Sequence, residues 1–218
     1  MAYHYPYPPN QGETPAAAGA RQAKAFIAAV KKAGGWRQYD LPPAIDLEYG
    51  YNPGENLTGE HAYSLVVIIT EIIRQMSAAF SAMPLLYCNS GYFRGFYAAA
   101  KSYYEHANGT GTWDDAWIAP FVQCPKWIFG QWPSKQVDFS TLSFDKPPGF
   151  AGAWDSGWSM WQWGILSNAS DLKQGPPAGA APDTTPRALG LPSDVDVNVW
   201  NGDLDSLAAL ASRTHWNA

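Results

Sequence analysis

The stretch Pro43-Ala44-Ile45-Asp46-Leu47-Glu48 decides the fold. It is a short apolar segment that carries two carboxylates, Asp46 and Glu48, two positions apart. Alternate residues of a β-strand point to the same side, so the carboxylates share one face and Ile45 and Leu47 share the other. We therefore expect a strand whose apolar face is covered by helices. Its acidic residues should lie at the strand end, where barrel-like α/β folds place their reacting groups.

Helices are predicted on both sides of this strand. Thr14-Pro15 is typical of a helix N-cap followed by proline in the first turn, and Gly34-Gly35 is typical of a helix end. Together they predict a helix over residues 16–32. Apolar residues at helical spacing predict a longer helix over residues 58–80.

The rest of the chain continues this alternation and then departs from it. The further expected elements are a strand at 84–88, a helix at 90–104, strands at 116–121, 158–163 and 195–199, and a short closing helix capped by Asp203. We expect irregular chain in the Trp-, Pro- and Gly-rich stretch after Phe121 and a loop over residues 168–192. Strands that alternate with helices indicate a parallel α/β fold. The chain length fits one domain over residues 1–218.

Composition excludes several classes of function. The net charge is -5 and no cluster of Lys and Arg occurs, which argues against a nucleic-acid partner. The sequence has no run of about 18 apolar residues, so no membrane partner is expected. It also has no zinc-type His/Cys spacing, and we expect neither a metal nor a cofactor. The 11 Trp and 12 Tyr residues suit sugar binding, although such side chains are also common in protein cores.

The acidic residues point to proton transfer. Asp46 and Glu48 lie roughly 6–7 Å apart along a strand, and like charges this close raise the pKa of one carboxyl group. The plain alternative is a solvated strand end. Asp196 and Asn198 share one face of the alternating stretch Val195–Val199, which indicates either a lined cavity or an edge strand with its polar side in water. Three carboxylates with many Trp and Tyr residues fit glycoside hydrolysis by paired acids.

Six pieces of the sequence, taken in order, resemble the lysozymes of glycoside hydrolase family 25, which cleave peptidoglycan. These pieces are Ala2-Tyr3-His4-Tyr5, the Asp-x-Glu segment Pro43–Tyr49, Leu86-Tyr87-Cys88-Asn89, Ala116-Trp117-Ile118-Ala119, Trp161-Gln162-Trp163 and Val195–Gly202. In the family they correspond to the third to sixth strands, a Trp-Gln-Tyr strand and the closing Val-Asp-x-Asn strand.

The resemblance implies an irregular TIM-like β/α barrel whose last strands are not separated by helices. It also implies hydrolysis of the β-1,4 bond between N-acetylmuramic acid and N-acetylglucosamine, with peptidoglycan glycan strands as the partner. Glu48 would be the general acid, and Asp46 would support the substrate's acetamido group or act directly on the anomeric carbon. Asp196 would orient or polarise groups within the site. The residues expected to line the sugar groove are Tyr3, Tyr87, Trp117 and Gln162, while His4 is expected to be a hydrogen bonder in the barrel interior.

The chain departs from the family at its N-terminus. Family members begin with two further strands, the first of which carries another acidic residue, and a barrel without them has two unpaired edges. We expect an N-terminally incomplete chain. The alternatives are that another segment fills the gap or that the protein is a degenerate relative. Two functions therefore compete, namely an active muramidase and a catalytically inactive glycan-binding module.

Smaller signals bear on where the protein works. The first residues are not those of a signal peptide, but the sequons at Asn56, Asn108 and Asn168 favour a secreted, extracellular protein. Cys88 and Cys124 could form one disulfide or remain two buried thiols. A monomer is expected unless a partner covers the open barrel edges.

Overall fold

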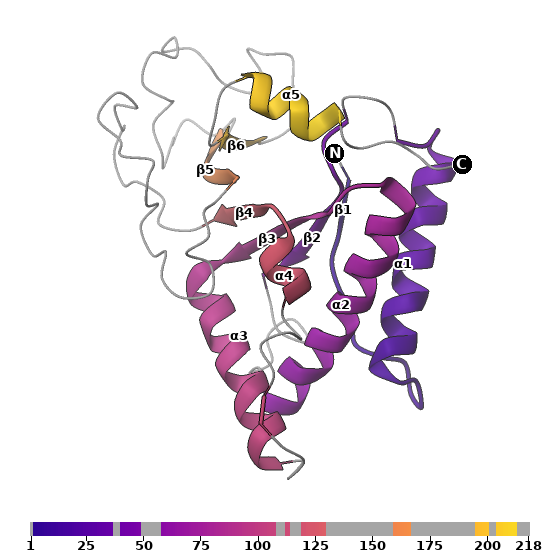
Figure 1. The fold of residues 1–218 in the computed structure, drawn as a ribbon, viewed down its shortest axis with the longest axis vertical. Helices are drawn as coiled ribbons and strands as arrows, with labels where there is room; N and C mark the ends of the chain where they lie inside the picture. Colours follow the sequence, from indigo (N-terminus) through magenta and orange to yellow (C-terminus); the bar gives the residue numbers. More distant parts are fainter. Residues whose placement is uncertain are drawn as a thin grey trace.

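A computed structural model of the chain describes residues 2–36, 40–48, 58–107, 112–113, 119–129, 159–166, 195–200 and 204–212. Its centre is one six-stranded sheet (Figure 1). The strands, which follow one another across the sheet in chain order, are β1 Tyr3–His4, β2 Ala44–Leu47, β3 Leu85–Asn89, β4 Lys126–Phe129, β5 Met160–Leu166 and β6 Val195–Trp200.

The sheet is parallel from β1 to β5, and β6 pairs antiparallel with β5. This confirms the mixed α/β fold with a parallel sheet and the direct pairing of the last two strands. Strand β1 lies at one edge of the described sheet and β6 at the other. The register across β2, β3 and β4 aligns Asp46 with Tyr87 and Tyr87 with Trp127.

The helices begin and end where local signals place them. They are α1 Pro15–Lys32, α2 Gly59–Phe80, α3 Ser90–Ser102 with the π-helical turn η1 Tyr103–Ala107, α4 Ala119–Gln123 and α5 Leu204–Ser212. The Thr14 hydroxyl accepts a hydrogen bond from the Ala17 amide at 3.2 Å. Gly34 and Gly35 end α1 with positive φ angles of 107° and 78°, which glycine adopts without steric cost. The two predicted long helices are thus confirmed to within one residue.

Helices α1, α2 and α3 lie on the same side of the sheet (Figure 1). The main core fills the space between these helices and the strands. Its strand residues are Ile45, Leu47, Leu86 and Cys88, and its largest helix residues include Phe26, Ile69, Ile72, Met76, Phe80 and Phe96. Because Ile45 and Leu47 face this core, the neighbouring Asp46 faces the opposite side of the sheet.

Helix α2 is long and apolar enough, by length and composition, to cross a membrane. Here it is the central core helix, since its apolar residues pack against α1, α3 and the sheet. The side chains that it buries are Ala62, Leu65, Val66, Ile68, Ile69, Ile72, Ile73, Met76 and Phe80. Within this fold the hydrophobic content of α2 is explained by its place at the centre of the core.

The strand predicted over residues 116–121 is wrong at its described end. Residues 119–123 form the short helix α4, and the next strand, β4, lies in the stretch that was predicted to be irregular. Short apolar runs do not distinguish helix from strand by periodicity. Pro120 suits a first helical turn, where its missing amide is not needed. Strand β4 is fixed instead by its pairing with β3, from Leu86–Lys126 to Asn89–Phe129.

The two cysteines are buried free thiols. Cys88 lies on the helix side of β3, and Cys124 lies between α4 and β4. Burial raises the pKa of the Cys124 thiol to about 12, and the nearby Lys126 ammonium opposes this rise only in part. The sequence left open either one disulfide or two buried thiols, and the structure has two buried thiols.

Candidate active site

Asp46 stands out on the face of the sheet opposite the one that α1, α2 and α3 cover. Its neighbours Ile45 and Leu47 are fully buried in the helix-side core, while Asp46 is only partly buried. On the Asp46 side of the sheet a second, smaller apolar cluster forms from Ala44, Leu85 and Met160, with Trp127 packed against it. Asp46 thus lies beside an apolar floor at the carboxyl end of a parallel strand, as the alternation of the sequence predicts.

The electrostatics of this position favour the protonated form of Asp46. Burial, and then the negative charge of Glu48, raise the pKa of Asp46 from 3.8 to about 7. Asp46 Oδ1 is buried and has no hydrogen-bond partner among the described residues. Glu48 follows the strand directly and is partly buried. A carboxyl group that titrates near neutrality, beside a second carboxylate, is suited to general acid and base chemistry.

An aromatic wall lies beside the acidic pair. Tyr87 of β3 is in register with Asp46, and Trp127 of β4 is in register with Tyr87. The Tyr87 and Trp127 rings meet edge to face, with centroids 4.7 Å apart and an interplanar angle of 63°. The structure thus brings the predicted Tyr87 to the site and adds Trp127, which sequence reasoning missed. The sequence carries no alternation that could have shown it, because Trp127, Ile128 and Phe129 are all apolar.

One row of residues across the sheet carries three polar residues and Phe129. In the row after Leu47, the register aligns Asn89, Phe129, Gln162 and Asn198 across strands β3 to β6. Gln162 therefore lies in the row of the sheet that follows Leu47, which is the position of Glu48 along the chain.

Asp196 lies near the start of β6. Because β6 is antiparallel to β5, it begins at the end of the sheet where the carboxyl ends of the parallel strands lie. Asp196, in register with Ile165, lies at this same edge, with β3, β4 and β5 between β6 and β2. The backbone thus places Asp196 at the same end of the strands as Glu48, but not on a strand adjacent to β2.

The other predicted groove residues have different fates. Tyr3 pairs with Ala44, one side-chain repeat before Asp46, and 68% of its surface is exposed. Trp117 lies outside the described residues, as do the sequon residues Asn56, Asn108 and Asn168. Tyr3 is therefore at the sheet edge rather than against the acidic pair.

His4 belongs to the helix side of the sheet. Its Nε2 is hydrogen-bonded to Gln22 Oε1 of α1 at 3.1 Å, and Gln22 also exchanges hydrogen bonds of 2.7 and 2.8 Å with the Tyr7 backbone. Burial lowers the pKa of His4, and the Gln22 hydrogen bond opposes this effect. His4 is thus a hydrogen bonder between strand and helix, and the expected position in a barrel interior is wrong.

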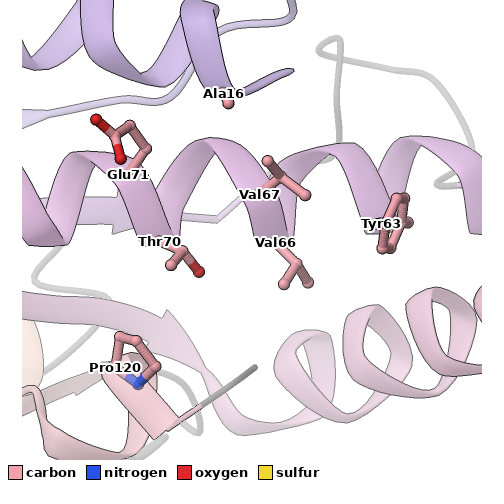
Figure 2. Close-up of a pocket in the computed structure, with 7 residues that line it drawn as sticks. All are labelled: Ala16, Tyr63, Val66, Val67, Thr70, Glu71 and Pro120. Carbon is pink, nitrogen blue, oxygen red and sulfur yellow. The ribbon is translucent and has the colours of Figure 1, made fainter. Parts of the chain in front are cut away.

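A cleft of about 380 Å³ lies elsewhere, among the helices (Figure 2). It is lined by Tyr63, Val66, Val67, Thr70 and Glu71 of α2, with Ala16 of α1 and Pro120 of α4. Among the residues that the structure describes, its lining comes from helices alone and does not include Asp46. Among the described residues, no group of three His, Cys, Asp or Glu side chains could hold a metal ion.

Solved lysozyme structures align with most of this chain. The crystal structure of the bacterial lysozyme from Streptomyces coelicolor aligns with 98% of this chain and 72% of that chain, at 20% identity and a TM-score of 0.51. A family GH25 lysozyme from Aspergillus fumigatus aligns with 95% of this chain and 71% of that chain, at 22% identity and a TM-score of 0.48. No protein-family model matches the sequence, and neither does any curated protein. The Streptomyces likeness shows that the chain has a fold of the lysozyme type.

Proposed function

We propose that the protein is a glycoside hydrolase that cleaves the β-1,4 bond between N-acetylmuramic acid and N-acetylglucosamine in peptidoglycan. The observation that carries the proposal is the acidic pair, with the pKa of Asp46 raised to about 7 by burial and by Glu48 at the carboxyl end of β2. Glycoside hydrolysis needs one carboxyl group that keeps its proton and one that is ionised. The lysozyme-type fold and the ordered sequence motifs favour peptidoglycan as the substrate.

Proton delivery is assigned to Glu48. The resemblance of Pro43–Tyr49 to the family 25 lysozymes implies this role for Glu48. Glu48 lies beyond the last residue of the strand, nearer the edge of the sheet than Asp46. In the proposed reaction Glu48 gives the proton to the glycosidic oxygen as the bond from that oxygen to the anomeric carbon breaks. The oxygen of a water molecule then bonds to the anomeric carbon, and the proton that this water loses returns to the Glu48 carboxylate.

Asp46 would act on the sugar ring whose anomeric carbon loses the glycosidic oxygen. In its ionised form Asp46 would support the substrate's acetamido group or stabilise positive charge at the anomeric carbon. Its buried Oδ1 has no hydrogen-bond partner among the described residues, so it can accept one from the substrate. Asp196 would orient or polarise groups from β6, and Tyr3, Tyr87, Trp117 and Gln162 would line the groove.

The wider assignments rest on the same fold. We infer one domain over residues 1–218, in which the sheet is part of an irregular β/α barrel that acts as a monomer outside the cell. The antiparallel pairing of β5 and β6 supports the irregular barrel. The three sequons support an extracellular site of action.

The test is cell-wall lysis with reducing ends counted, for the wild type, Glu48→Gln and the control Glu60→Gln. Glu60 is an exposed glutamate in the first turn of α2, so its loss should leave activity unchanged. We expect new reducing ends from the wild type and the control, and at least a hundredfold fewer from Glu48→Gln. Peptidoglycan binding without reducing ends from any variant would contradict the enzyme and favour the inactive glycan-binding module.

A further inference from the structure

The Tyr87–Trp127 pair is a candidate surface for ligand contact on the Asp46 side of the sheet. Both residues are only partly buried, although the strands that carry them are central in the sheet. Trp127 packs against the small cluster of Ala44, Leu85 and Met160, which supports its ring from the sheet side. Its neighbour Tyr87 meets it edge to face at 4.7 Å. An indole supported in this way is held in one orientation.

The position of this surface fits one class of ligand. Asp46, Tyr87 and Trp127 follow one another in register on adjacent strands, so Trp127 lies two strand spacings, roughly 10 Å, from Asp46. A linked chain of sugars that extends from the ring under attack can span that separation. The apolar face of a pyranose stacks on aromatic rings, and Trp has the largest ring system of any side chain.

We propose that Trp127 is an aromatic platform that holds one N-acetylhexosamine ring of the glycan beside the acidic pair, with Tyr87 setting the tilt of the indole. The inference rests on the proposed function and names a specificity-determining residue of that same site. It assigns the contact to β4, the strand that follows α4. Trp127 touches the sugar ring, and Tyr87, from its own place in the groove, is the positioning residue for Trp127.

The experiment measures binding apart from catalysis. Glu48→Gln serves as the parent, and isothermal titration calorimetry gives its affinity for the tetramer of β-1,4-linked N-acetylglucosamine. We expect Trp127→Ala to weaken this affinity about tenfold and Trp127→Phe, which keeps an aromatic face, about threefold. The matched control is Trp36→Phe. Trp36 packs on Phe80 and donates its indole N–H to the Leu41 carbonyl on the helix side, so the affinity should not change.

A second readout separates contact from folding. On cell walls, with Glu48 restored, Trp127→Phe should raise KM about threefold and leave kcat within twofold, whereas a purely structural role would lower thermal stability without this split. Unchanged affinity and KM in folded Trp127→Phe and Trp127→Ala proteins would overturn the platform and leave the hydrolase intact. If the parent binds no tetramer and the wild type releases no reducing ends, the proposed function fails and the platform fails with it.

Discussion

Asp46 of β2 lies directly beside Tyr87 of β3 in the parallel register, at the end of the sheet where Glu48 leaves the strand. The carboxyl group therefore has a strand bearing an aromatic residue on one side and a second carboxylate two residues further on. Burial in this setting is the larger cause of its raised pKa, and Glu48 is the smaller. This relationship makes the site both titratable near neutrality and unfavourable for stability, and each property can be measured.

Asp46→Asn should remove a pH-dependent loss of stability. The folded protein binds the Asp46 proton up to a pKa of about 7, whereas the unfolded chain releases it near 3.8. The native state thus holds more protons between these values, so the stability of the wild type falls as pH rises from about 4 to 7. Because Asp46 is partly exposed, solvent screening reduces the effect to about 1–2 kcal/mol.

Urea unfolding of both proteins at pH 4.5, 6 and 8 tests this. The free energy of unfolding of Asp46→Asn, relative to that of the wild type, should increase with pH. A difference between the two proteins that stays constant across this range would contradict the raised pKa. Activity should fall at every pH, because the amide cannot ionise.

Glu48→Gln should lower the pKa of Asp46. The substitution removes the neighbouring negative charge but leaves the burial, so the pKa should fall below about 7 and stay above its ordinary value of 3.8. Carboxyl ¹³C chemical shifts of labelled aspartate, followed from pH 3 to 9, would report it. Glu60→Gln on α2 is the control and should leave the Asp46 titration unchanged. An equal Asp46 pKa in the two variants would show that Glu48 does not couple to Asp46.

Local patterns in the sequence predicted the elements that depend on local physics. Thr14 and Gly34-Gly35 fixed the ends of α1 because capping involves only neighbouring residues. Alternation separated Asp46 from Ile45 and Leu47 for the same reason, since side-chain direction in a strand repeats every two residues. The raised pKa within an acidic pair was also foreseeable from the spacing of Asp46 and Glu48.

The remainder depends on tertiary packing. Strand β4 has four residues, one of them Lys126, and it forms because β3 offers a parallel partner rather than because of its own pattern. Trp127 was missed for this reason. Nor could spacing decide which carboxyl group of the pair is buried, since that depends on what packs around Asp46. The prediction of a barrel-interior position for His4 was wrong because its hydrogen-bond partner Gln22 lies on α1, 18 positions away in the sequence. Local patterns could not identify such a distant partner.

Acid should destabilise the contact between β1 and α1. Burial holds the pKa of His4 below 6.5, so the unfolded chain takes up a proton before the folded one. Stability present above pH 6.5 is therefore lost as pH falls below it. In His4→Asn, which cannot be protonated, the midpoint of thermal unfolding should fall less than in the wild type between pH 7 and 5. An equal fall in both proteins would show that His4 is not the group responsible.

Gly19→Ala should separate α1 from α2. A Cβ at Gly19 would lie 2.6 Å from the Ile68 carbonyl oxygen and 2.9 Å from Glu71 Cβ, and neither is a flexible side-chain end that can turn away. The helices must move apart, at a cost of about 1–3 kcal/mol in the free energy of unfolding. Gly95→Ala in α3 is the matched control, because nothing lies within 4 Å of its added Cβ. There the better helix propensity of alanine should raise stability by about 0.5–1 kcal/mol. Urea unfolding of the two variants should thus give changes of opposite sign, and a stabilised Gly19→Ala would contradict the close approach of α1 and α2.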